Sequence, residues 1–254
     1  MRNFASVKLF QELGKRLLMY ASFSPIFVVS KRTYTMKVII TGATGMVGKG
    51  ILLECLADTN ITEVLLISRS PIDLENPKIK ELLIPNFMDI PQHADQLKGY
   101  DACFHAMGVS SAGMSEEKYT ALTYDISMNL AKTLYALNPG MTFNYISGAG
   151  TDSSEQGRSM WARVKGKTEN DIRALGFKHA YSFRPGGIIP EGGVKSRTSW
   201  YQTFIVLFKP IFPLIKGWHL VSTTGQIGRA MIRSVGNDLG LEILESRDIK
   251  RIGA

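Results

Sequence analysis

"TGATGMVGKG", residues 41–50, lies between an apolar β-branched run at 37–41 and a segment in which apolar residues recur at helical spacing. Its glycines Gly42, Gly45 and Gly48 form a GxxGxxG pattern. Such a pattern is weak evidence alone, but directly after a strand and at the start of a helix it is typical of a dinucleotide-binding loop. Glycine lets the backbone turn tightly and approach a pyrophosphate, whose charge meets the amides and dipole of the helix N-terminus. The alternative is a glycine-rich turn without a ligand.

From Met36 onward, strands and helices alternate in the manner of βαβ units, which predicts a parallel sheet covered by helices on both faces. The alternation breaks beyond Pro190. We therefore predict an α/β fold, a single-domain Rossmann-type doubly wound parallel sheet over residues 36–254, with a small C-terminal substrate cover at about 190–222. The expected strands lie at 37–41, 63–68, within 78–90 and closing near Asp89, at 101–108, 141–148 and 179–187; the expected helices include one at about 116–137, one around Trp161 and Lys165, and one at 223–235 capped by Thr223 or Thr224.

The formal net charge of +8 is concentrated at the N-terminus. Residues 1–35 hold six basic residues and one acid, so they carry +5 of the total and leave +3 for the rest. A body so nearly balanced lacks the clustered basic surface that binding to a phosphate backbone needs, so no nucleic-acid partner is expected. Cys55 and Cys103 lie in apolar patterns away from histidines, so we predict no disulfide framework, no metal site and a cytoplasmic protein.

Two apolar segments raise the question of membrane contact. The segment 1–35 is basic and nearly acid-free, which suits a targeting segment or a membrane-surface helix; we favour a loosely attached, poorly ordered N-terminal extension. The segment 194–222 is interrupted by lysines and prolines, which argues against a transmembrane span. We expect it to cover the substrate side of the cofactor. The absence of acids from Gly192 to Asn237 also fits a peripheral association with anionic lipid.

The residue after the second predicted strand bears on which dinucleotide is expected. NAD-specific sites usually place an acid there to accept from the ribose 2′-hydroxyl, whereas this chain reads Ser68-Arg69-Ser70. A guanidinium at this place would pair with a 2′-phosphate, so the sequence favours NADP(H) over NAD. The alternative is that Arg69 is a solvated surface residue.

The TGATGMVG loop and the motifs that follow it resemble the short-chain dehydrogenase/reductase superfamily in its extended or atypical branch, which includes NAD-dependent epimerases and dehydratases. The resemblance covers about residues 36–190. Within the superfamily the chain looks most like the Tat-interacting-protein-like atypical dehydrogenases, whose helix carries a stretch similar to VKGKTE at 164–169 here. The resemblance implies a cofactor site formed by Thr41, Gly42, Thr44, Gly45, Met46, Val47, Gly48 and Arg69, by Asp89 beside the adenine, by Ala106, Met107 and Gly108 flanking the cofactor, by Lys165, and by Arg184, Pro185 and Gly186 near the nicotinamide.

The catalytic motif of that family is incomplete in this chain. In the family a tyrosine four residues before a lysine forms, with a serine, a YxxxK proton-transfer site. This chain offers Ser147 and Lys165 but has Trp161 in place of the tyrosine. An indole N–H donates a hydrogen bond but cannot give up and recover a proton. A proton would then come from Lys165, from water, or from another hydroxyl such as Thr151, Ser159 or Tyr201; alternatively, the chemistry needs only hydride transfer to an activated acceptor.

Each of the two remaining catalytic candidates has an ordinary structural alternative. Lys165 would otherwise be a solvated helix lysine, and Ser147 a strand-end serine that caps a turn. The sequence predicts an NADP(H)-binding atypical short-chain dehydrogenase-like oxidoreductase that acts on a small apolar carbonyl or alkene. The alternative is a non-catalytic NADP(H)-binding sensor or scaffold, for which Trp161 is the main argument. Besides the dinucleotide and a small-molecule substrate, further copies of the chain in an oligomer remain open as partners.

Overall fold

The central sheet consists of seven parallel strands. The computed structural model describes residues 35–192 and 220–254. The strands are β1 (Met36–Thr41), β2 (Ile61–Ser68), β3 (Ile79–Leu83), β4 (Ala102–His105), β5 (Thr142–Ile146), β6 (His179–Arg184) and β9 (Ile243–Glu245). Their order is β3-β2-β1-β4-β5-β6-β9, which reverses between β1 and β4 and creates there the switch point at which open α/β sheets bind ligands. The predicted Rossmann-type doubly wound sheet is confirmed.

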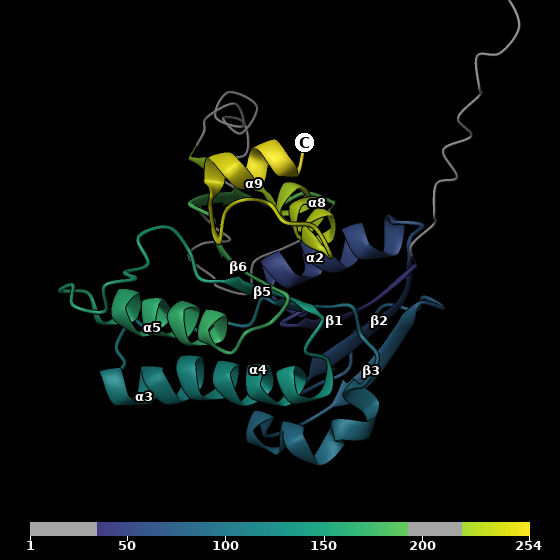
Figure 1. Ribbon diagram of the computed structural model, residues 1–254, viewed down its shortest axis with the longest axis horizontal. Helices are drawn as coiled ribbons and strands as arrows, with labels where there is room; N and C mark the ends of the chain where they lie inside the picture. The colour runs from purple at the N-terminus through teal and green to yellow at the C-terminus, as the bar shows by residue number, and fades with distance from the viewer. Residues whose placement is uncertain (1–34, 193–219) are drawn as a thin grey trace, which may run out of the picture. The chain divides into compact units, whose positions relative to one another are not determined.

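Helices cover both faces of this sheet (Figure 1). Because side chains alternate along a strand, Val38 and Ile40 enter one core and Ile39 enters the other, and all three are fully buried. Each such side chain contributes about 1.5–3 kcal/mol to stability by its burial. The first core lies under α2 (Met46–Ala57), α8 (Thr224–Ser234) and α9 (Ser246–Ile252), and the second lies under η1 (Phe87–Leu97), α4 (Ile126–Leu137) and α5 (Met160–Ala174).

The third strand is shorter than predicted. It ends at Leu83 and not near Asp89. Pro85 follows, which has no N–H to donate to a ladder, and the side chain of Asn86 accepts from the Met88 amide at 3.1 Å. The chain therefore turns helical at this point, and Asp89 lies half-buried in the first turn of η1.

The three expected helices are present, the one around Trp161 and Lys165 as α5, and the one at 116–137 has an unexpected central turn. The predicted helix at 116–137 comprises α3 (Glu116–Thr120), a π-helical turn η2 (Ala121–Asp125) and α4. The predicted cap of α8 is confirmed: Thr223 Oγ1 accepts from the Gln226 amide at 3.1 Å, and Gln226 Oε1 accepts from the Thr223 amide at 3.0 Å. This capping box fixes the start of the helix.

The C-terminal part adds structure that the sequence did not predict. β9 pairs with β6 through Ser182–Ile243, Phe183–Leu244 and Arg184–Glu245, and so extends the sheet. A second, two-stranded sheet is formed by β7 (Gly187–Ile189) and β8 (Val221–Thr223). Most of the expected substrate cover and the N-terminal extension lie outside the described residues. None of the helices within 35–192 and 220–254 has the length and apolar character needed to cross a bilayer.

Candidate functional site

The glycine loop connects β1 to α2, and its three glycines differ in what surrounds them. Gly42 has a φ of +76°, and an added Cβ there would lie 2.6 Å from the carbonyl oxygen of Ala106. At Gly48 an added Cβ would lie 2.2 Å from the Gly42 carbonyl oxygen. Backbone packing therefore requires glycine at both positions. Gly45 has a φ of −87°, and an added Cβ would lie 3.3 Å from the Gly42 carbonyl oxygen, a tight contact that a shift of a few tenths of an ångström relieves, so packing restricts this position far less than the other two.

Gly45 instead lines a cleft of about 350 Å³. As the N-cap residue of α2 it has no side chain that could cap the first helical amides, and the first turn of α2 contains no acid. The amides and the dipole of this helix are consequently available to an anion, and the residues present fit a pyrophosphate. The cleft is lined by Ala43, Thr44, Gly45 and Lys49 on the side of the loop and α2, and by Pro71, Ile72 and Asp73 on the side that follows β2.

Two charged residues of this cleft were not predicted from the sequence. Lys49 directly follows the third glycine of the motif, and this place in the sequence could have identified it as a residue of the cleft. Asp73 brings a carboxylate to the opposite wall. Arg69 is exposed and directly follows β2, shortly before that wall, so its predicted contact with a 2′-phosphate stays a prediction. The same holds for Asp89 and its predicted place beside an adenine.

A buried histidine, His105, links the ends of β1 and β4. Ser127 Oγ donates to the Thr123 carbonyl at 2.5 Å, so it must accept from His105 Nε2 at 2.8 Å. Nδ1 is therefore the acceptor, and Thr41 Oγ1 donates to it at 2.6 Å. Burial, aided by the charge of Lys165, lowers the pKa of His105 to about 3, which keeps the ring neutral. The Thr41 side chain is fully buried, and its hydroxyl proton is committed to this histidine.

The structure brings the predicted pair Ser147 and Lys165 together. Lys165 Nζ donates to the main-chain carbonyl of Ser147, and the Ser147 hydroxyl donates to the carboxylate of Glu169. Burial lowers the pKa of Lys165 to about 8, and the charge of Glu169 opposes this shift. Lys165 is thus not a solvated helix lysine, and the Ser147 hydroxyl does not cap the turn after β5.

Trp161 lies in the first turn of α5, against the loop that follows β5. Gly150 in that loop has a φ of +84°, and an added Cβ there would be 3.5 Å from the indole Cη2. The indole therefore packs at Gly150, on the loop that begins with Ser147 after β5. Of the hydroxyls considered as substitute proton donors, Thr151 donates to the Gly148 carbonyl at 2.7 Å, Ser159 is the exposed N-cap of α5, and Tyr201 lies outside the described residues.

The residues after β6 lie at the same end of the sheet. The Pro185 carbonyl accepts from the Ala149 amide at 3.0 Å, in the loop that contains Gly150. The Gly186 amide donates to Ser246 Oγ at 2.7 Å, and an added Cβ at Gly186 would lie 2.6 Å from the Leu220 carbonyl oxygen. Ala106, Met107 and Gly108 follow β4, where Ala106 approaches Gly42. The carboxyl ends of β1, β4, β5 and β6 thus collect most of the predicted residues.

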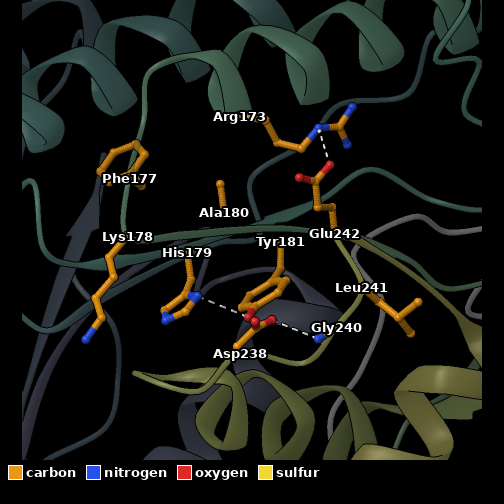
Figure 2. A pocket seen from close by; sticks show the side chains of 10 residues that line it. All are labelled: Arg173, Phe177, Lys178, His179, Ala180, Tyr181, Asp238, Gly240, Leu241 and Glu242. Atoms are coloured by element: carbon orange, nitrogen blue, oxygen red, sulfur yellow. Dashed lines mark hydrogen bonds and ion pairs between the residues drawn. The ribbon is translucent and has the colours of Figure 1, made fainter.

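A different cleft, of about 470 Å³, lies at the amino end of β6 (Figure 2). The rings of His179 and Tyr181 stack there at 5.9 Å. Tyr181 Oη donates to the Asn237 carbonyl at 2.6 Å and accepts from the Leu239 amide at 3.1 Å, so this phenol holds the loop before β9. Ligands of open α/β sheets bind at the carboxyl ends of the strands, so this larger cleft is not the candidate cofactor site.

Comparisons with known proteins bear on the family. No family model matches the chain. The mitochondrial protein FMP52-1 of Scheffersomyces stipitis is 29% identical over 158 residues, which are 61% of this chain and 69% of that protein. The protein HTATIP2 of Rattus norvegicus is 26% identical over 154 residues, which are 60% of this chain and 62% of that protein. The resemblance to the atypical short-chain dehydrogenase/reductases is confirmed.

Solved structures agree in fold. A UDP-N-acetylglucosamine 4-epimerase from Methanobrevibacter ruminantium, in complex with UDP-N-acetylmuramic acid, superposes with a TM-score of 0.61 at 18% identity, covering 83% of this chain and 75% of that one. The Bordetella bronchiseptica enzyme WbmF, in complex with NAD⁺, gives 0.59 at 13% identity, covering 86% and 77%. Both likenesses show the fold, and the second is to a protein that binds a nicotinamide dinucleotide.

The expected cytoplasmic location is wrong. The FMP52 relatives are named mitochondrial proteins, which contradicts it. The prediction rested on two unpaired cysteines, which indicate a reducing compartment but do not distinguish the cytoplasm from others. For the segment 1–35, the loosely attached extension that we favoured and the targeting segment that we left open both stay predictions.

Proposed function

We propose that the chain binds a nicotinamide dinucleotide, NADP(H) in preference to NAD(H), at the carboxyl ends of β1 and β4. The observation that carries this proposal is Gly45, which backbone packing restricts far less than Gly42 and Gly48 and which lines the cleft at the uncapped start of α2. A side chain at Gly45 would occupy the space through which a pyrophosphate approaches the helix amides.

Bound there, the cofactor would supply hydride transfer, and the chain would position it. Gly45 and the first amides of α2 would hold the pyrophosphate. Arg69 and Lys49 would offer cations to a 2′-phosphate, and this pair supports the preference for NADP(H). Lys165 would donate to the ribose near the nicotinamide. Met107 and Gly108 after β4, and Pro185 and Gly186 after β6, would flank the nicotinamide half.

Calorimetric titration of the full chain with NADPH and with NADH tests the proposal. We expect both to bind, NADPH with the lower Kd. Absence of binding heat with either dinucleotide at millimolar concentration would overturn the proposal. Tighter binding of NADH would overturn the preference while leaving the dinucleotide site intact.

We further propose an oxidoreductase that acts on a small apolar carbonyl or alkene. Ser147 and Lys165 would contact the reacting groups. Both residues lie together because Lys165 and Glu169 of α5 form hydrogen bonds with Ser147. The apolar character of the substrate rests on the sequence of 194–222, most of which lies outside the described residues. Single-turnover oxidation of bound NADPH against a panel of apolar aldehydes, ketones and enones, followed at 340 nm, tests this function.

A non-catalytic NADP(H) sensor or scaffold is the second candidate, and Trp161 favours it. An indole at the position of the family's tyrosine cannot relay a proton, and it packs against the loop that carries Ser147. Tight NADPH binding with no oxidation across the panel would support the sensor. Oxidation by any member of the panel would support the oxidoreductase.

A further inference from the structure

Glu169 lies in α5 one helical turn after Lys165, and its side chain is fully buried. Its carboxylate accepts from the Ser147 hydroxyl on Oε1, from Arg184 Nε on Oε1 at 3.0 Å, and from Arg184 Nη2 on Oε2. A buried carboxylate is tolerated when it is both paired and hydrogen-bonded, and the guanidinium supplies both. Glu169 is therefore held in one orientation, facing Ser147.

Arg184 is committed to protein groups on several sides. From the end of β6 its Nη2 also donates to Ser153 Oγ at 2.5 Å, and its Nη1 lies 3.7 Å from Glu245 Oε1. Its side chain is only 12% exposed. This guanidinium therefore joins the loop after β5, α5 and β9. In this arrangement the guanidinium fixes the orientation of Glu169.

The direction of the Ser147 hydroxyl follows from these contacts. A serine hydroxyl has one proton and two lone pairs. The groups it faces as a donor are the Glu169 carboxylate and, at 3.3 Å, the Phe183 carbonyl, and both are acceptors. The carbonyl of Ser147 in turn accepts from Lys165 Nζ. Lys165 and Glu169, four residues apart in α5, thus form hydrogen bonds with the carbonyl and the hydroxyl of Ser147.

We propose that Glu169 is a positioning residue of the candidate site: it accepts a hydrogen bond from the Ser147 hydroxyl, so that Ser147 presents lone pairs to a bound molecule, and it places a carboxylate one helical turn from the Lys165 ammonium. The proposal rests on the proposed function, because it takes Ser147 and Lys165 as the groups that meet cofactor and substrate. A ligand group at Ser147 Oγ must then be a hydrogen-bond donor, such as a hydroxyl or a carboxamide N–H. A carbonyl oxygen finds no donor at this hydroxyl, so of the two residues only Lys165 would donate to the oxygen of a carbonyl substrate.

The charge of Glu169 also has a measurable effect on Lys165. Burial lowers the pKa of Lys165 to about 8, and Glu169 opposes the shift. Without that carboxylate, burial acts unopposed and the ammonium loses its proton at lower pH. A purely structural Glu169, which only stabilised the fold, would leave the titration of Lys165 unchanged once the variant was folded.

The test is an NMR titration of the nucleotide-free full chain after reductive ¹³C-methylation of its lysines, with the Lys165 signal assigned through Lys165→Arg. We expect a midpoint that is lower by roughly one pH unit in Glu169→Gln than in the wild type. Glu169→Asp, which keeps the charge, should restore most of the shift. Glu245→Gln, which removes the other acid near Arg184, is the matched control and should leave the midpoint unchanged. An unshifted midpoint in folded Glu169→Gln would overturn the proposal.

A second measurement needs no change at Glu169. In the wild type, the Ser147 hydroxyl proton should give a slowly exchanging resonance with a nuclear Overhauser contact to the Glu169 side chain, and Ser147→Ala should remove it. The absence of that resonance in the wild type would overturn the proposed direction of the hydroxyl, even if Glu169→Gln failed to fold. Both measurements use protein without nucleotide, so their failure is distinguishable from a failure to bind NADPH.

Discussion

Thr41 Oγ1 donates a hydrogen bond to His105 Nδ1 across 2.6 Å and so ties the last residue of β1 to the last residue of β4. Burial, with a contribution from Lys165, lowers the pKa of His105 from 6.5 to about 3. As pH falls below 6.5, the unfolded chain binds a proton at this imidazole and the folded chain does not. The contribution of neutral His105 is therefore complete above pH 6.5 and is lost as pH falls from there toward 3.

Replacement of His105 by asparagine should remove this pH dependence. Below pH 6.5 the wild type should lose about 1.4 kcal/mol of unfolding free energy per pH unit through this group. His105→Asn should not show this pH-dependent loss. Urea unfolding of both proteins at pH 7, 6 and 5 measures it, since the other titrating groups are common to both. A free-energy difference between the two proteins that stays constant from pH 7 to pH 5 contradicts the assignment.

Alanine at the three loop positions should separate packing from binding. Gly48→Ala and Gly42→Ala should cost about 1–3 kcal/mol of unfolding free energy or more, because the added methyl meets backbone atoms. Gly45→Ala should cost less than about 1 kcal/mol, because its φ is accessible to alanine. It should nevertheless weaken NADPH binding by about tenfold or more, because the methyl enters the cleft. Denaturation and calorimetry on the same samples decide; wild-type affinity in Gly45→Ala would contradict the role given to this glycine.

The charges around the cleft should set the choice between the two dinucleotides. Arg69→Ala and Lys49→Ala should each raise the Kd for NADPH about tenfold and leave that for NADH nearly unchanged, because only NADPH carries the 2′-phosphate. Asp73→Asn should lower the Kd for NADPH, since it removes a negative charge that lines the same cleft and repels the phosphate.

Lys98→Ala is the matched control for these cations, because Lys98 is a surface lysine paired with Asp95 at the end of η1. The ratio of the two dissociation constants, measured at one fixed ionic strength, should not change in this control. If neither Arg69→Ala nor Lys49→Ala changes the ratio, the cleft does not bind the 2′-phosphate.

Restoring the missing phenol should raise turnover. Trp161→Tyr places an ionisable hydroxyl one helical turn before Lys165, and general acid catalysis should accelerate single-turnover oxidation of NADPH by on the order of 10²-fold. Trp161→Phe, which keeps an aromatic ring against Gly150 without a proton to transfer, should show no gain. Loss of an existing activity in both variants would instead show that the indole itself is used.

Much of the fold was predictable because buried parallel strands have continuous apolar sequences. β1 and β2 are such runs, and the glycine loop between β1 and α2 marks the switch point of the sheet. β9 was not predicted because a strand of three residues is too short to show an alternating apolar pattern. The π turn at Ala121–Asp125 was missed because it leaves the apolar spacing of its flanking helices intact.

The candidate site was predictable where a motif is contiguous, and not where it is assembled from distant segments. The loop glycines follow from local spacing. The pairing of Glu169 with Arg184 joins α5 to β6, and the contact of Thr41 with His105 joins β1 to β4, so neither follows from one stretch of sequence. The glycines also looked equivalent in the sequence, and only the structure shows that Gly45 differs from Gly42 and Gly48.

A crystal structure of the chain with NADPH tests the central claim most directly. We expect the pyrophosphate over Gly45 and the first amides of α2, the 2′-phosphate between Arg69 and Lys49, and the nicotinamide toward Ser147 and Lys165. A dinucleotide bound elsewhere, for instance in the cleft at the amino end of β6, or crystals that take up none at millimolar NADPH, would contradict it.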